Sequence, residues 1–83
     1  MSTAGPTVTV RFWAGARRAA GRREEQVVAP DVRALRALLS ERPELASVVA
    51  ASSLLVDGVA PADENAPLRD GAVVDVLPPF AGG

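Results

Sequence analysis

The amino-acid sequence predicts a single α+β domain, with a mixed sheet of four to five strands and one main helix packed across it. Three observations indicate this class: a strand pattern opens the chain, an amphipathic helix pattern follows, and strand patterns return before the end. The 83 residues suffice for one domain with a modest core. With 48% hydrophobic residues, the chain is apolar enough to fold without cross-links.

Two strands and a short helical segment are expected in the first third of the chain. Residues 7–13 alternate apolar and polar side chains, as a half-buried strand does, with Phe12 on the inner face and Trp13 on the outer face. Trp13 would either be exposed for a partner or be covered by loop residues. Residues 14–20 are rich in alanine and arginine, which favours a helix, and a glycine follows. Residues 24–28 form the second predicted strand.

The main helix is expected between Asp31 and Pro43. The Asp31 carboxylate can accept hydrogen bonds from the free amides of the first turn, as a good N-cap does. Pro43 disfavours the helical conformation of the residue before it, so the helix should end there. Arg33, Arg36 and Glu41 fall outside an apolar stripe and should face water. That stripe consists of Val32, Leu35, Leu38 and Leu39.

A short helical turn, a hairpin and a last strand are expected after the main helix. Apolar residues at 45–49 suggest the turn, and residues 53–56 form a strand that leads into Asp57-Gly58, a hairpin signal. The return strand at residues 59–60 is cut short by a proline. The last strand, residues 72–77, is apolar apart from one outward aspartate.

This order of elements suits a mixed sheet with a helix across one face, for which a β-grasp is the natural candidate. The order alone leaves other α+β folds open. We expect residues 1–6 to be a disordered lead-in, residues 7–77 to form the β-grasp domain, and residues 78–83 to form an extended C-terminal tail.

The chain contains no histidine and no cysteine, which excludes several kinds of site. It cannot form a disulfide, a thiolate metal site or a histidine-based catalytic triad. Its acidic residues lack the spacing of a calcium loop, so no metal site is expected. Any catalysis therefore needs a partner that supplies most of the machinery.

Overall charge and hydropathy argue against nucleic-acid and membrane partners. The formal net charge is −1, which gives no reason to expect either of them. The longest mostly apolar stretch, residues 45–56, is too short for a bilayer and is interrupted by serines. No targeting signal is visible, so we expect a cytoplasmic location.

Positive charge is concentrated in the first half of the chain. Residues 1–42 hold eight arginines against four acids, and residues 43–83 hold one against six. The local cluster consists of Arg17, Arg18, Arg22 and Arg23. It is either a solvated face or a docking site for an acidic partner.

The C-terminal tail has the composition of a segment that extends its terminal carboxylate into the active site of another protein. Pro78 and Pro79 stop sheet pairing and stiffen an extended exit. Phe80 is a large apolar residue near the terminus, where its own domain offers little burial. Gly82 and Gly83 carry no Cβ, so this backbone can pass through a narrow channel. Six extended residues reach about 20 Å.

From about Val8 to Gly83 the chain resembles the small, sulfur-carrying subunit of molybdopterin synthase, in the ubiquitin-like β-grasp superfamily. The resemblance rests on residues 8–21, the helix from Asp31, the turn at residues 68–71 and the ending at residues 76–83. The terminal diglycine after a final strand and two prolines is the specific part of the match.

The resemblance implies a carrier that some proteins load with sulfur and another protein unloads. An E1-like enzyme would use ATP to adenylate the Gly83 carboxylate, and a sulfur donor protein would convert it to a thiocarboxylate. The large subunit of the synthase would then take the tail and pass the sulfur to the pterin precursor of the molybdenum cofactor. The residues expected in its channel are Gly82, Ala81, Phe80, Pro79 and Pro78. The chain itself would bind no cofactor and would be non-catalytic on its own.

Other functions stay open at this point. Sulfur carriers for thiazole or cysteine biosynthesis use the same chemistry, and thiazole carriers have a tight turn between the first two strands. The longer connection at residues 14–23 favours the molybdopterin family. A ubiquitin-like protein modifier and a small binding domain with an inert tail are the remaining alternatives.

Overall fold

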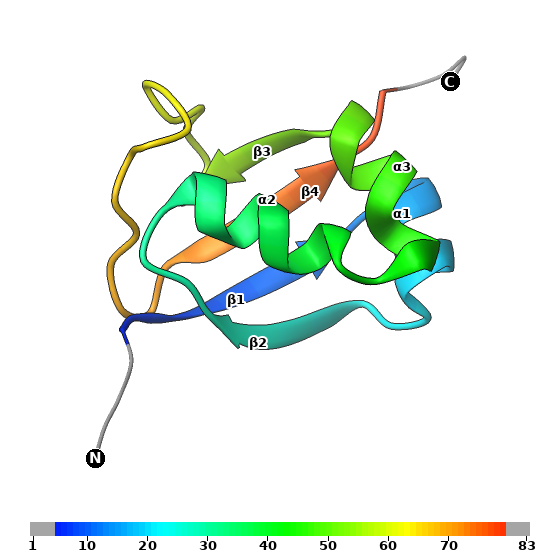
Figure 1. The fold of residues 1–83 in the computed structure, drawn as a ribbon, viewed down its shortest axis with the longest axis horizontal. Helices are drawn as coiled ribbons and strands as arrows, with labels where there is room; N and C mark the ends of the chain where they lie inside the picture. Colours follow the sequence, from blue (N-terminus) through cyan, green and yellow to red (C-terminus); the bar gives the residue numbers. More distant parts are fainter. Residues whose placement is uncertain (1–4, 80–83) are drawn as a thin grey trace.

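The computed structural model describes residues 5–79. This range contains seven helices and strands, joined by turns and loops. They follow in the order β1 (Thr7–Phe12), α1 (Ala14–Ala20), β2 (Glu24–Val28), α2 (Val32–Ser40), α3 (Pro43–Ala51), β3 (Ser53–Val56) and β4 (Val73–Leu77) (Figure 1). α3 is a helix of nine residues, where the sequence indicated only a short turn. Between residues 5 and 79, no helix combines the length and the apolar content that crossing a bilayer requires.

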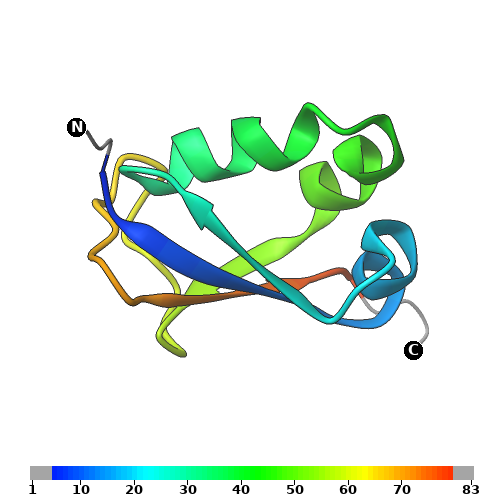
Figure 2. The same ribbon diagram turned by 90° about the horizontal axis from the view of Figure 1, so that it is seen from below.

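The four strands form one mixed sheet in the order β2-β1-β4-β3. β1 is antiparallel to β2 and parallel to β4, and β3 runs antiparallel to β4. α2 and α3 lie over one face of this sheet, and α1 lies at the end where β1 finishes (Figures 1 and 2). The predicted α+β class, with a mixed sheet and helix packing across it, is confirmed.

The predicted hairpin turn at Asp57-Gly58 is also present. Both residues have positive φ, 50° and 83°, as a two-residue turn of this kind requires. The backbones of Val56 and Val59 exchange hydrogen bonds of 2.8 and 3.0 Å. Beyond this isolated bridge, Pro61 has no amide with which to extend a ladder. The described sheet therefore has four strands, and the return segment adds no fifth.

The hydrophobic core lies between the sheet and helices α2 and α3. It combines the inner faces of β1 and β4 with the apolar sides of the two helices. Its largest fully buried side chains are Phe12, Leu35, Leu39, Leu45, Val8, Val10, Val32, Val49, Val74 and Val76. Phe12 and most of the predicted helix stripe are thus core residues.

The start of α2 follows the prediction, but one member of its stripe does not. Asp31 Oδ1 accepts a hydrogen bond of 2.8 Å from the Ala34 amide, so Asp31 is the N-cap. Leu38, by contrast, is 37% exposed. At 3.6 residues per turn it lies about 90° from the centre of the stripe, so it reaches the rim of the core and not its interior.

Arg36 connects α2 to the end of α3. Its Nη1 donates hydrogen bonds to the carbonyl oxygens of Val49 (2.8 Å) and Ser52 (3.1 Å). Its Nε donates to Glu64 Oε1 at 3.0 Å. The prediction that Arg36 faces water was therefore wrong, because the last carbonyls of a helix lack partners within the helix and attract a cation.

Candidate functional site

The candidate site lies where β4 ends, because the residues predicted to carry the chemistry follow this strand. β4 finishes at Leu77, and Pro78 and Pro79 follow it outside the sheet, half-buried and exposed respectively. Four predicted site residues fall outside the described part of the chain: Phe80, Ala81, Gly82 and Gly83. The end of β4 is thus the described feature that leads to them.

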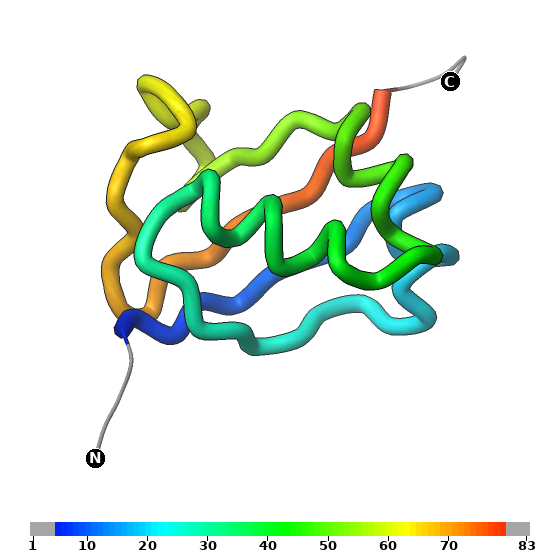
Figure 3. Tube along the Cα trace, in the orientation of Figure 1, coloured from blue at the N-terminus to red at the C-terminus, as the bar shows by residue number. Residues whose placement is uncertain are grey.

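Parallel pairing places the end of β1 beside the end of β4. Phe12 aligns with Val76, and the Trp13 backbone amide donates a hydrogen bond of 3.3 Å to the Val76 carbonyl. The two strands lie side by side along the trace although they come from opposite ends of the sequence (Figure 3). The end of β1 is therefore a direct neighbour of the point where the chain leaves the sheet.

The outer face of the sheet, opposite α2 and α3, carries a row of side chains in register. Glu24, Arg11, Asp75 and Leu55 align across β2, β1, β4 and β3. Arg11 thus lies between two carboxylates, and its Nε donates a hydrogen bond of 2.8 Å to Asp75 Oδ1. Opposite charges on neighbouring strands stabilise the pairing, so the row supports the centre of the sheet.

Asp75 is the buried member of this row, with 9% of its surface exposed. The same Oδ1 accepts a second hydrogen bond, of 2.9 Å, from Trp13 Nε1. Burial alone would raise the pKa of Asp75, but the hydrogen bonds from Arg11 and Trp13 and the positive charge of Arg11 together hold the pKa below its ordinary value. The carboxylate is therefore charged at neutral pH and positions both donors.

Trp13 is an exposed aromatic residue held in place on the outer face. Its surface is 41% exposed, so the alternative in which loop residues cover it does not apply. The Arg11 guanidinium carbon lies 5.5 Å from the centre of the indole ring, within the range of a cation–π contact. Fixed aromatic side chains of this kind are enriched among the residues that dominate protein–protein binding.

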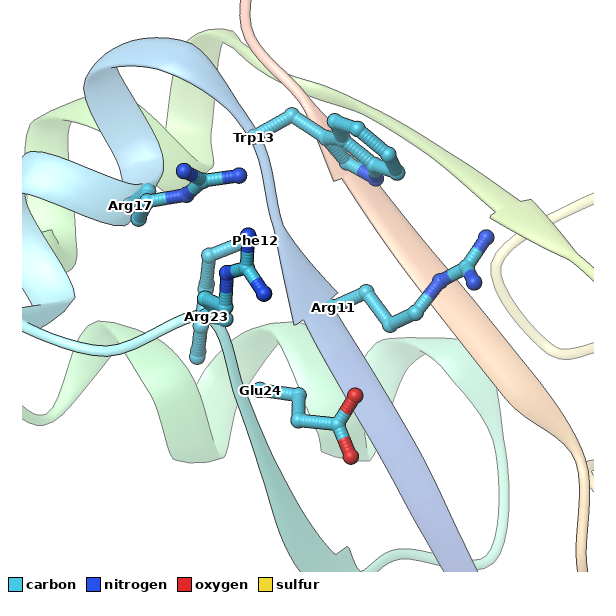
Figure 4. Close-up of a pocket in the computed structure, with 6 residues that line it drawn as sticks. All are labelled: Arg11, Phe12, Trp13, Arg17, Arg23 and Glu24. Atoms are coloured by element: carbon cyan, nitrogen blue, oxygen red, sulfur yellow. The ribbon is translucent and has the colours of Figure 1, made fainter.

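A hollow of about 260 Å³ lies beside this row, between the end of β1, α1 and the start of β2. Its lining residues are Arg11, Phe12, Trp13, Arg17, Arg23 and Glu24 (Figure 4). Arg17 and Arg23 extend toward the same space on one side of β1, whereas Arg11 and Trp13 extend over β4 on the other side (Figure 4). We call this feature the arginine pocket.

Comparison with known proteins identifies the family of the chain. A model of the ThiS family matches residues 10–83. The chain belongs to the ThiS family. No curated protein matches it.

Solved structures resemble this ThiS-family protein over nearly its whole length. A chain in the protein–protein complex of subunits 1 and 2 of molybdopterin-converting factor from Helicobacter pylori 26695 is 30% identical, with a TM-score of 0.75, over 93% of this chain and 99% of that one. The small archaeal modifier protein 1 (SAMP1) from Methanosarcina acetivorans is 23% identical, with a TM-score of 0.81, over 98% of this chain and 100% of that one. SAMP1 from Haloferax volcanii is 25% identical, with a TM-score of 0.76, over 93% and 99%.

Together these matches show that the ThiS-family protein is a ubiquitin-like sulfur carrier with a β-grasp fold. The resemblance inferred from the diglycine ending and the opening strand is thereby confirmed at the level of the family.

The arginine cluster predicted for this ThiS-family protein divides in two. Arg17 and Arg23 line the arginine pocket, and Arg18 and Arg22 do not. Arg22 lies 3.9 Å from the Glu25 carboxylate, at the limit of an ion pair. Within residues 5–79, neither Arg17 nor Arg23 makes an ion pair. The cluster is therefore not one uniform charged face.

Sequence reasoning missed the link between Arg11, Trp13 and Asp75. Arg11 and Asp75 are 64 residues apart, and only the parallel pairing of β1 with β4 brings them together. The available signal was one outward charge of each sign on the first and last strands, combined with the pairing of those strands in a β-grasp.

Proposed function

We propose that this ThiS-family carrier is the small subunit of a molybdopterin synthase. In this role Gly83 carries a thiocarboxylate, and its sulfur passes to the pterin precursor of the molybdenum cofactor. The observation that carries the proposal is the likeness to the Helicobacter pylori chain from the molybdopterin-converting factor complex, which extends over nearly all of both chains. The Gly82-Gly83 ending after two prolines supports it.

Partner proteins activate Gly83 in two steps. A free carboxylate is a poor acceptor for a sulfur nucleophile, so an E1-like enzyme first uses ATP to form an acyl-adenylate, which turns one oxygen into part of a leaving group. A sulfide-level sulfur nucleophile from a sulfur donor protein then attacks the acyl carbon, AMP leaves with the electron pair of the broken C–O bond, and the sulfur stays on Gly83 as the thiocarboxylate. Because the chain has neither histidine nor cysteine, the acids, bases and sulfur nucleophiles of these steps belong to the partners.

The carrier itself presents its carboxyl end. Pro78 and Pro79 end the sheet because they lack amide donors, and Gly82 has no side chain to obstruct a channel. Together with Phe80 and Ala81, these residues occupy the channel of the large subunit, in the cytoplasm. A larger partner is supported by the Helicobacter pylori relative, which was solved as a complex of subunits 1 and 2.

Protein modification is a second candidate function, favoured by the likeness to SAMP1 from Haloferax volcanii. The activated Gly83 would then form an isopeptide bond with a lysine of a target protein. The chain contains no lysine, so in this role it would be attached singly and would not form side-chain-linked chains of itself.

Intact-mass analysis after co-expression with an E1-like enzyme and a sulfur donor tests the proposal. We expect a mass gain equal to the exchange of one oxygen for one sulfur, located at Gly83 by fragmentation. An unchanged mass would overturn the carrier function, and conjugates with other proteins would identify a modifier. Adding the large subunit and the pterin precursor should return the carrier to its original mass; a carrier for thiazole or cysteine would keep its sulfur.

A further inference from the structure

The arginine pocket holds more positive charge than its own surroundings compensate. Arg11 shares its charge with Asp75, and Glu24 lies beside Arg11 in the strand register. Arg17 and Arg23, in contrast, make no ion pair with any residue from 5 to 79. This end of the domain is therefore locally positive, although the formal net charge of the chain is −1.

We propose that the arginine pocket binds a carboxylate-rich peptide segment of the protein that receives the tail. The assignment to that protein rests on the proposed function. Arg17 and Arg23 reach into the hollow from α1 and from the turn before β2 (Figure 4). Two guanidinium groups that share one space can each form charge-assisted hydrogen bonds with a carboxylate.

The remaining lining residues favour a peptide carboxylate over a phosphate group. Trp13, which is 41% exposed, offers an apolar surface at the edge of the hollow that suits the methylene groups of a glutamate side chain, whereas the Phe12 side chain is buried in the core. Glu24 contributes a negative charge to the same hollow, and its Coulomb repulsion is larger for a doubly charged phosphate than for a singly charged carboxylate.

The position of the pocket relates it to the tail. Its residues Phe12 and Trp13 are paired with Val76, one residue before the end of β4. A protein that takes up the segment after β4 therefore comes close to the pocket as well. Complementary charge beside such a contact speeds association and sets its orientation, and Trp13 offers an exposed aromatic surface next to it.

A peptide titration tests the charge chemistry directly. Trp13 is the single tryptophan of the chain, so its fluorescence reports on the pocket without a label. We expect a glutamate-rich hexapeptide to shift the emission in a saturable way, and the corresponding glutamine peptide to have no effect. The double variant R17E/R23E should weaken the Kd at least about tenfold, because two charge-assisted contacts are lost.

The matched control is the double variant R18E/R22E, which makes the same change in net charge at the neighbouring positions outside the pocket. It should bind the peptide with nearly the wild-type Kd. Circular dichroism and urea unfolding establish that both variants fold, and R17Q/R23Q provides a milder pair. An equal loss in both glutamate variants would overturn the pocket, as would tighter binding of inorganic phosphate or ATP than of the peptide.

Calorimetric titration with the purified large subunit tests the partner assignment. Weaker binding of R17E/R23E, with R18E/R22E unchanged, supports it; equal binding of all three proteins overturns it. The intact-mass measurement of sulfur loading, which tests the proposed function, is independent of these two binding experiments. A wild-type chain that acquires no sulfur overturns the proposed function and with it the assignment of the partner, whereas the peptide titration still decides whether the pocket binds carboxylates.

Discussion

The carboxylate of Asp75 organises the outer face of the sheet. One oxygen accepts hydrogen bonds from Arg11 at 2.8 Å and from Trp13 at 2.9 Å, so one side chain holds both the arginine and the aromatic ring. The aspartate is buried while its two partners are partly exposed. Asp75 therefore supports the two exposed residues from a buried position.

Asp75→Asn should lower the free energy of unfolding at pH 7 by about 1 kcal/mol, because a charged acceptor becomes neutral in a pair that solvent partly screens. The pKa of Asp75 is lower in the folded state than its ordinary value of 3.8. Its stabilising contribution is therefore complete above that value and is lost as pH falls through the folded pKa. The difference between the two proteins should shrink on acidification.

Urea unfolding at a series of pH values, followed by Trp13 fluorescence, measures this difference. Glu44→Gln, at an exposed position on α3, makes the same charge change and should leave the pH dependence close to that of the wild type. A difference between wild type and Asp75→Asn that stayed constant from neutral to strongly acidic pH would contradict the role given to Asp75.

At the scale of elements, side chains satisfy the free ends of the two helices that cover the sheet. Asp31 accepts a hydrogen bond from the first turn of α2, and Arg36 donates two hydrogen bonds to carbonyls at the end of α3. Because Arg36 itself belongs to α2, the end of one helix is fixed by the middle of the other. The pair therefore packs on the core as a unit.

Asp31→Ala should reduce the free energy of unfolding by about 1 kcal/mol, since the amide of Ala34 loses its acceptor. Asp31→Ser keeps an oxygen that can cap the helix and should retain most of the stability. Chemical denaturation of the three proteins provides the measurement. Equal losses for the alanine and serine variants would show that the cap contributes nothing.

Local patterns predicted most of these elements because they depend on residues only a few positions apart. The alternation of β1, the cap of α2 and the turn at Asp57-Gly58 are all of this kind. The extent of α3 was missed because Pro43 was interpreted only as the end of α2. Proline is equally suited to the first turn of a helix, and Pro43 occupies that position in α3.

At the scale of the whole molecule, the candidate site depends on contacts between distant parts of the chain. The arginine pocket combines residues of β1, α1 and β2 with the turn before β2. Asp75 contacts two of its lining residues, Arg11 and Trp13, only because the first and last strands pair in parallel. Residue types alone do not reveal such pairing. Gly83 and its neighbours remain a prediction of the sequence, which rests on residue types and not on contacts between distant parts of the chain.

Deleting Gly83 should abolish sulfur loading and leave the stability of the domain unchanged, since a terminal glycine buries almost no apolar surface. Adding one residue after Gly83 should have the same effect, because it moves the carboxylate away from the activating enzyme. Intact-mass analysis measures loading, and urea midpoints measure stability. Normal loading of the shortened chain would place the chemistry elsewhere.

The interior position of β4 has a mechanical consequence. This strand is flanked by β1 and β3 and is hydrogen-bonded to both, and the sequence continues from it directly to Gly83. Traction on the carboxyl end acts along the strand axis and strains both ladders at once, in shear. An edge strand would instead peel away one bond after another. A domain built this way therefore resists unfolding when its carboxyl end is pulled.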